Sequence, residues 1–228
     1  MKTVFFDFDG TLTKDCLPTW ININGILRRN GAEVTGELYQ MFINEEIDYK
    51  EWCELTIAKL KKYNFLRSDF EEVARNTKLI GGVYEAFETL RANGWRIQIV
   101  SGGITEIIRL ALGDALKFVE KITANEVFFT EDGTLDKIYA TEYDYKGKAV
   151  YIQNYINANK ISPKDAVFVG NGSNDEWVFT TGAKTICVNP EDTDPNNKTI
   201  WHEAYVDIDN IKTILPAILD KDSLEKAN

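Results

Sequence analysis

The feature that most constrains the fold is an alternation of short apolar runs with amphipathic helical segments. Buried strands are indicated by apolar runs at 4–6, 95–100, 166–169 and 185–188. Helical periodicity is found between or after these runs, at 83–93, 105–112, 148–158 and 176–181. Because parallel strands need helical crossovers, this order predicts an α/β fold with a Rossmann-like, doubly wound parallel sheet as its core.

Two segments do not follow the alternation. From about 17 to 79 the pattern is helical without a good strand run, which predicts an inserted helical unit. After 105–112, an apolar stretch leads into Asp132-Gly133, a pair typical of a β-hairpin turn, so we expect a peripheral hairpin there. The polar tail at 220–228 is expected to fray.

Composition and charge narrow the function classes. With 228 residues and 44% hydrophobic content, the chain can bury a full core. The net charge of -10 argues against nucleic-acid and anionic-membrane partners and favours a small substrate. The sequence predicts no signal peptide and no membrane span, and its three scattered cysteines fit a reducing compartment, so we expect a cytoplasmic protein.

Two carboxylates follow the first strand in the run Asp7-Phe8-Asp9-Gly10-Thr11. In a doubly wound sheet, ligands lie outside the carboxyl ends of the strands, which is where this pair falls. Two close carboxylates suit Mg²⁺, and they also permit covalent catalysis, in which one attacks phosphorus and the other serves as general acid and base. The alternative is a solvated Asp-Gly turn.

Three further segments carry polar or charged residues next to the ends of predicted strands or helices. Ser101-Gly102-Gly103 follows the second strand, where a hydroxyl and free backbone N–H groups could meet an anion, or where the serine could merely cap a helix. Lys146-Gly147-Lys148 precedes a helix and offers a fixed cation. Residues 170–175, Gly-Asn-Gly-Ser-Asn-Asp, could complete a metal site or form an Asn-Gly turn.

In this order, the four segments resemble the haloacid dehalogenase superfamily, specifically its phosphoserine-phosphatase-like branch. The resemblance covers the whole chain. It implies a core of 1–14 and 80–228 and a helical cap of 15–79 that closes over the site and excludes water. For the individual residues it implies the following roles: Asp7 as nucleophile, Asp9 as general acid and base, Ser101 and Lys146 as phosphate contacts, Thr11, Gly102, Gly103, Asp15 and Cys16 at the substrate, and Asp7, Asp9, Asn171 and Asp175 on the side of the Mg²⁺ ion.

The sequence departs from the family at two places. The fourth motif normally begins Gly-Asp-Gly, whereas Asn171 replaces the aspartate here, which removes a negative charge from the metal side. The family's serine-binding glutamate falls at Cys16, next to Asp15, and the corresponding cap helix has no arginine. Arg28 and Arg29 are alternative partners for a substrate carboxylate. Aromatic residues of the cap could line a pocket or pack in the core: Trp20, Tyr39, Phe42, Trp52 and Tyr63.

The sequence therefore predicts a Mg²⁺-dependent phosphomonoester hydrolase that acts on a small phosphorylated metabolite through an aspartyl-phosphate on Asp7. Two alternatives stay open: a phosphoserine phosphatase with altered recognition residues, and a weakly active protein that binds a phosphorylated ligand, because of Asn171. We expect a monomer or homodimer with no cofactor beyond Mg²⁺.

Overall fold

A seven-stranded sheet forms the centre of the computed structural model, which describes residues 1–33 and 36–219. The spatial order of its strands is β4-β3-β2-β1-β5-β6-β7. The strands are β1 (Lys2–Phe6), β2 (Trp95–Ile104), β3 (Val119–Phe129), β4 (Leu135–Tyr139), β5 (Ala166–Gly170), β6 (Lys184–Val188) and β7 (Glu203–Tyr205). The β3–β4 pair is antiparallel and the other described pairs are parallel, so the predicted α/β fold with a Rossmann-like sheet is confirmed.

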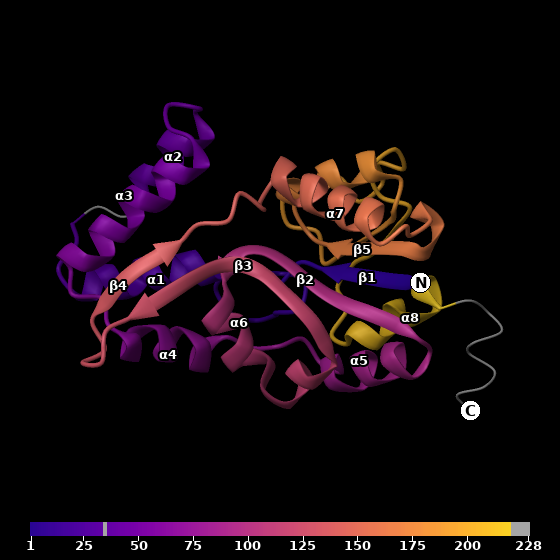
Figure 1. The fold of residues 1–228 in the computed structure, drawn as a ribbon, viewed down its shortest axis with the longest axis horizontal. Helices are drawn as coiled ribbons and strands as arrows, with labels where there is room; N and C mark the ends of the chain where they lie inside the picture. Colours follow the sequence, from indigo (N-terminus) through magenta and orange to yellow (C-terminus); the bar gives the residue numbers. More distant parts are fainter. Residues whose placement is uncertain (34–35, 220–228) are drawn as a thin grey trace.

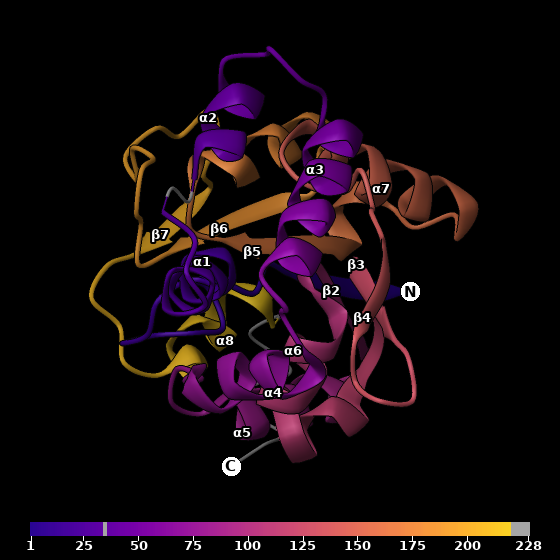
Figure 2. The same cartoon turned by 90° about the vertical axis from the view of Figure 1, so that its left-hand side faces the viewer.

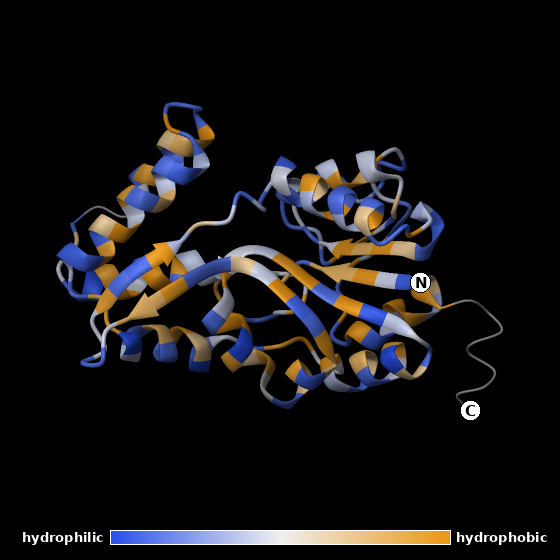
Figure 3. Cartoon of the chain, viewed as in Figure 1, coloured by the Kyte–Doolittle hydropathy of each residue, from blue (hydrophilic) through white to orange (hydrophobic). Residues whose placement is uncertain are grey.

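Helices cover both faces of this sheet (Figure 1). Beyond the helices of the insertion, they are α5 (Val83–Ala92), α6 (Thr105–Leu112), α7 (Lys146–Ala158) and α8 (Leu215–Ile218). Successive side chains of a strand point to opposite faces: Phe6 packs in the apolar cluster shared with α5 and α8, whereas Phe5 packs in the one shared with α7. The hydrophobic colouring of β1 and β5 in Figure 3 reflects burial on both faces.

The described residues of the insertion between β1 and α5 form four α-helices. They are α1 (Thr19–Arg29), α2 (Glu37–Ile43), α3 (Tyr49–Lys62) and α4 (Arg67–Asn76). An antiparallel bridge between Thr13 and Leu79 joins the two ends of the insertion. Helix α4 lies beside α6 (Figure 2), and Phe70 of α4 shares an apolar cluster with Ile107 and Leu135. The insertion is therefore packed against the hairpin and α6 on one side, and its assignment as a separate cap stays a prediction.

Three details of the strands differ from the sequence prediction. The hairpin is not an isolated appendage, because β3 first pairs in parallel with β2 and only then turns into β4. Strand β2 continues to Ile104, with a register shift between Val100 and Ile104. Strand β7 was not predicted. The tail expected at 220–228 lies outside the described residues, and within the described part no helix is long and apolar enough to cross a membrane.

Candidate active site

The carboxyl ends of three neighbouring strands meet at the centre of the sheet. Strand β1 lies between β2 and β5, and the chain leaves these two neighbours in opposite directions along the sheet. A cavity of about 330 Å³ opens at this point, and among its lining residues are Asp7, Asp9, Ser101 and Asn171. The fold thus brings residues of the first, second and fourth predicted motifs together at the position expected for a ligand in such a sheet.

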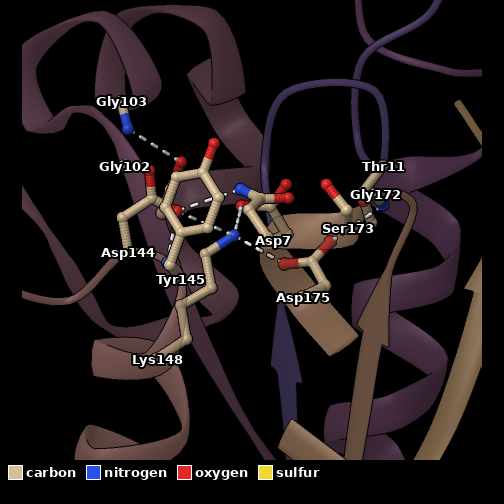
Figure 4. Close-up of polar contacts among 12 residues, drawn as sticks. Asp7, Thr11, Gly102, Gly103, Asp144, Tyr145, Lys148, Gly172, Ser173 and Asp175 are labelled. Carbon is tan, nitrogen blue, oxygen red and sulfur yellow. Dashed lines mark hydrogen bonds and ion pairs between the residues drawn. The ribbon is translucent and has the colours of Figure 1, made fainter. Parts of the chain in front are cut away.

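A buried lysine connects three carboxylates beside the cavity (Figure 4). Lys148 is fully buried, and its Nζ donates to Oδ1 of Asp7 over 2.8 Å and to Oδ1 of Asp175 over 2.6 Å. Oδ1 of Asp144 lies 3.6 Å from the same Nζ. Burial alone would lower the pKa of Lys148, but the charges of Asp175 and Asp7 outweigh burial and raise this pKa well above its usual value. Lys148 is therefore a fixed cation next to Asp7.

The structure corrects the lysine assignment. Lys146, predicted as the phosphate contact, is exposed and its Nζ lies 5.3 Å from the centre of the Trp177 ring. Helix α7 begins at Lys146, two residues earlier than predicted, and two residues correspond to a rotation of about 200° around a helix. Lys148 consequently points toward the site, whereas Lys146 points away from it. The lysine beside Asp7 is therefore Lys148 and not Lys146.

The start of helix α1 orients Asp9. Oδ1 of Asp9 accepts hydrogen bonds from the backbone N–H of Thr19 over 3.2 Å and from its hydroxyl over 3.0 Å. Thr19 is the first residue of α1, so the carboxylate also lies at the positive end of the helix dipole. Burial nevertheless dominates and raises the pKa of Asp9 to about 6. A carboxyl group with this pKa can both donate and accept a proton near neutral pH.

The backbone after Val100 is held by hydrogen bonds that the sequence did not predict. The Ser101 hydroxyl accepts from the backbone N–H of Gly103 over 3.1 Å. Nδ2 of Asn125, a fully buried residue of β3, donates to the carbonyl oxygens of Gly102 and Gly103 over 3.0 and 3.1 Å. The indole N–H of Trp20 also donates to the Gly102 carbonyl over 3.0 Å. Ser101, Gly102 and Gly103 all line the cavity, and the phosphate and substrate contacts expected of them stay predictions.

Asn171 lies against the turn that follows the first strand. Gly10 has a φ of +73°, and a β-carbon at Gly10 would come within 2.2 Å of Nδ2 of Asn171, so this close approach requires glycine. The Thr11 hydroxyl donates to Oδ1 of Asn171 over 3.2 Å. Nδ2 of Asn171 lies 3.5 Å from Oε2 of Glu191. The amide therefore connects the turn at Asp9-Gly10 with the loop that carries Glu191.

Asp175 is a supporting residue. It is fully buried, and its Oδ2 accepts from the backbone N–H groups of Asn171 and Gly172 over 2.8 and 3.3 Å while its Oδ1 binds Lys148. Asp175 is absent from the cavity lining formed by the described residues, in contrast to Asp7, Asp9 and Asn171. It thus fixes the fourth motif and Lys148 in place.

Three residues predicted at the substrate lie elsewhere. Thr11 is fully buried, Asp15 is exposed, and the Sγ of Cys16 accepts from the Lys78 backbone N–H at 3.3 Å. In the described part of the chain, none of the three lines the cavity. Cys16, the position at which the resembling family carries its serine-binding glutamate, is therefore not at this cavity wall.

Sequence reasoning missed several residues around the cavity. Asp144 binds Lys148 at 3.6 Å and accepts from Nδ2 of Asn174 over 3.0 Å. Tyr145 has a φ of +46° and its hydroxyl lies 2.7 Å from that of Tyr39. The position of Asp144 and Tyr145 directly before the lysine motif was the available signal, whereas nothing in the sequence indicates Asn125.

Comparison with known proteins identifies a family and a relative of this chain. The family model described as haloacid dehalogenase-like hydrolase matches residues 4–176. A phosphoserine phosphatase of Lactococcus lactis subsp. lactis (strain IL1403) is 28% identical over 186 residues, which are 81% of this chain and 82% of the relative.

Two solved structures have the same fold. One is a substrate-bound phosphoserine phosphatase complex, with a TM-score of 0.71 at 20% identity, covering 96% of this chain and 98% of the other. The second is a phospho-aspartyl intermediate analogue of phosphoserine phosphatase, with a TM-score of 0.70 at 20% identity, covering 96% and 99%. The chain belongs to the haloacid dehalogenase-like hydrolase family, and within that family it is similar to phosphoserine phosphatases.

Proposed function

We propose that this protein hydrolyses a small phosphorylated metabolite in a Mg²⁺-dependent reaction that passes through an aspartyl-phosphate on Asp7. The observation that carries the proposal is that two separately held carboxylates border one cavity. Asp7 is held by Lys148 at 2.8 Å, and Asp9 is held by Thr19 at 3.0 Å. Different neighbours allow the two carboxylates to take different roles.

The first half of the reaction transfers the phosphoryl group to the protein. A carboxylate oxygen of Asp7 attacks phosphorus, and the bond between phosphorus and the leaving oxygen breaks. Asp9 donates its proton to that leaving oxygen, so the alcohol departs uncharged. Lys148 offsets negative charge beside the nucleophile.

The second half regenerates the enzyme. Asp9, now ionised, takes a proton from water, and the resulting hydroxide attacks phosphorus. The bond between phosphorus and Asp7 breaks, which releases inorganic phosphate and restores both carboxyl groups to their starting states. The hydroxyl of Ser101 and the backbone of Gly102 and Gly103 line the cavity where the phosphoryl oxygens would lie.

The oxygen donors at the cavity suit Mg²⁺, which prefers such ligands and keeps several waters. Asp7, Asp9 and Asn171, which carry side-chain oxygen atoms, line the cavity, and backbone carbonyls and substrate phosphate would add further donors. Within the described residues, no group of three acidic, histidine or cysteine side chains is gathered tightly enough to hold a metal alone. When bound, the ion would neutralise phosphoryl charge. Burial, opposed by Lys148, raises the pKa of Asp7 to about 8, and a bound cation would favour the ionised nucleophile.

Closure of the helical insertion over the site, a cytoplasmic location and a monomeric or homodimeric state remain part of this proposal. So does the absence of nucleic-acid and membrane partners, which the net charge of -10 favours.

The test is phosphate release from a panel of phosphomonoesters with and without Mg²⁺, for the native chain and for Asp7→Asn. We expect Mg²⁺-dependent release by the native chain, phosphorylated protein in rapidly quenched samples, and neither in Asp7→Asn. Release that persists in a folded Asp7→Asn variant would rule out the covalent route. Binding of phosphorylated ligands without any turnover would favour the binding-protein alternative that Asn171 raises.

A further inference from the structure

The cavity has two chemically different walls. The wall from the sheet carries polar residues of the first, second and fourth motifs, among them Asp7, Asp9 and Ser101. The opposite wall comes from α1, α2 and α3 and is mostly apolar. Its large side chains are Trp20, Ile23, Leu27, Leu38, Tyr39 and Trp52. A phosphomonoester bound with its phosphate at Asp7 would thus place its alcohol portion against aromatic and aliphatic side chains.

The apolar wall is held in a fixed arrangement. Trp20 and Trp52 make an edge-to-face contact with ring centres 5.0 Å apart, and Trp52 is only 6% exposed. The indole N–H of Trp20 bonds to the Gly102 carbonyl on the phosphate side at 3.0 Å. At the mouth, the hydroxyls of Tyr39 and Tyr145 lie 2.7 Å apart. A wall tied to the phosphate side at two points needs little ordering when a ligand binds.

The charges around the cavity disfavour an alcohol with a carboxylate. Of the described lining residues, Lys59 is the sole lysine or arginine, and it is already ion-paired with Glu37. Arg29, one of the sequence candidates, lies outside the lining and pairs with Glu72 at 2.6 Å. Glu191 is among the acidic residues that line the cavity. A second anionic group on the substrate would therefore meet like charge without a free cation.

We propose that the apolar wall selects phosphomonoesters of uncharged, apolar alcohols over phosphoserine. This inference rests on the proposed function, because it takes the phosphate to lie at Asp7. The volume of about 330 Å³ sets the scale, since it lies at the small end of ligand pockets and suits a short alkyl or single-ring alcohol.

The test compares kcat/KM for phosphoserine with that for ethyl, butyl and hexyl phosphate. The alkyl esters have alcohols of similar acidity, so differences among them report burial of the chain and not leaving-group chemistry. We expect kcat/KM to rise by about fourfold per methylene until the wall is filled, and hexyl phosphate to exceed phosphoserine. A flat alkyl series, or a preference for phosphoserine, would overturn this inference and leave the hydrolysis itself intact.

If no ester is hydrolysed, the affinity for alkylphosphonates tests whether the apolar wall binds the alkyl chain. Ethyl-, butyl- and hexylphosphonate, which are not hydrolysed, are titrated calorimetrically into the native chain with Mg²⁺. Affinity that increases with chain length supports the apolar wall even though the proposed hydrolysis has failed. Equal affinities would overturn the inference.

A matched pair of variants on α2 tests whether the preference for longer alkyl chains depends on the apolar wall. Leu38→Asn places an amide in the wall, and Ile43→Asn makes the same change on the same helix at a position that is 44% exposed and outside the lining. We expect Leu38→Asn to lower the ratio of hexyl to ethyl kcat/KM, or of the phosphonate affinities, by roughly four- to fifteenfold, the value of one to two methylenes. Ile43→Asn should leave the ratio unchanged. An equal effect of both variants would contradict the proposal.

Discussion

Lys148 Nζ lies 2.8 Å from Asp7 Oδ1, although the two residues are 141 positions apart in the sequence. The contact joins the first turn of α7 to the end of β1, and both side chains are almost completely buried. A buried cation facing Asp7 and Asp175 offsets charges that would otherwise be costly in a medium of low dielectric constant. The same pair therefore affects both folding and the reactivity of Asp7.

Replacing Lys148 by methionine should damage both properties. The change leaves Asp7 and Asp175 buried without their cation, so we expect the free energy of unfolding to fall by about 3–5 kcal/mol. We also expect kcat to fall by about 10²–10³-fold, as when a fixed charge-stabilising donor is removed. Urea denaturation and steady-state phosphate release measure the two effects.

Lys146→Met is the matched control, since it makes the same substitution two residues away on the exposed side of α7. It removes the contact with the Trp177 ring, which is worth about 0.5–1 kcal/mol at an exposed site, and should leave kcat unchanged. If Lys146→Met lost activity and Lys148→Met kept it, the roles assigned to these lysines would be reversed.

Much of the fold could be predicted because local pattern and tertiary environment agree. Val4, Phe5 and Phe6 form a run that can be buried on both faces, and the structure places it at the centre of the sheet. Strand β7 could not be predicted, since its three residues are half-buried and have no periodicity to reveal them. The parallel half of β3 was missed for a related reason: residues such as Glu120 and Lys121 are exposed at its start.

The sequence predicted which segments form the site, but it did not predict which side chains of these segments point into it. A motif locates a turn, but the direction of a side chain depends on where the next helix begins. The predicted start of α7 was two residues too late, and Lys146 was therefore chosen in place of Lys148. The sequence did not indicate Asn125, because this residue acts by donating to backbone carbonyls of a neighbouring strand. Such a role depends on strand register, which the sequence does not state.

Asn171→Asp should strengthen Mg²⁺ binding. The new carboxylate would stand next to the Thr11 hydroxyl at a position that lines the same cavity as Asp7 and Asp9, and affinity for a hard cation rises with ligand charge. We expect about tenfold tighter binding in calorimetric titration, with higher turnover at limiting Mg²⁺. Glu191 lies 3.5 Å from the Asn171 amide, so the metal-free variant should be less stable than the native chain.

Asn76→Asp adds the same charge at the exposed end of α4 and serves as the control. It should leave the Mg²⁺ affinity unchanged. Equal titration curves for native chain and Asn171→Asp would mean that the side chain at 171 does not contribute to metal binding.

The three cysteines should differ in reactivity toward a thiol reagent at pH 8. Burial raises the pKa of both Cys53 and Cys187 to about 12, so almost no thiolate forms in the folded chain, and both side chains are shielded. Cys16 is only half-buried. We expect one thiol to react under native conditions and three after denaturation. Rapid native modification of more than one would show that α3 or β6 opens.

Two glycine substitutions should change stability in opposite directions. Gly25 lies inside α1, and apart from its two chain neighbours and the helix backbone a β-carbon added there would have no atom within 4 Å, so Gly25→Ala should raise the free energy of unfolding by about 0.5–1 kcal/mol. Gly10→Ala forces a φ of +73° on a residue with a β-carbon and pushes that carbon into the Asn171 amide. We expect a loss of about 1–3 kcal/mol, and lower kcat because Asn171 must move. Urea denaturation of both variants, with kcat measured at saturating Mg²⁺, tests the pair; a Gly10→Ala variant as stable and active as Gly25→Ala would mean that the turn after Asp9 adapts without displacing Asn171.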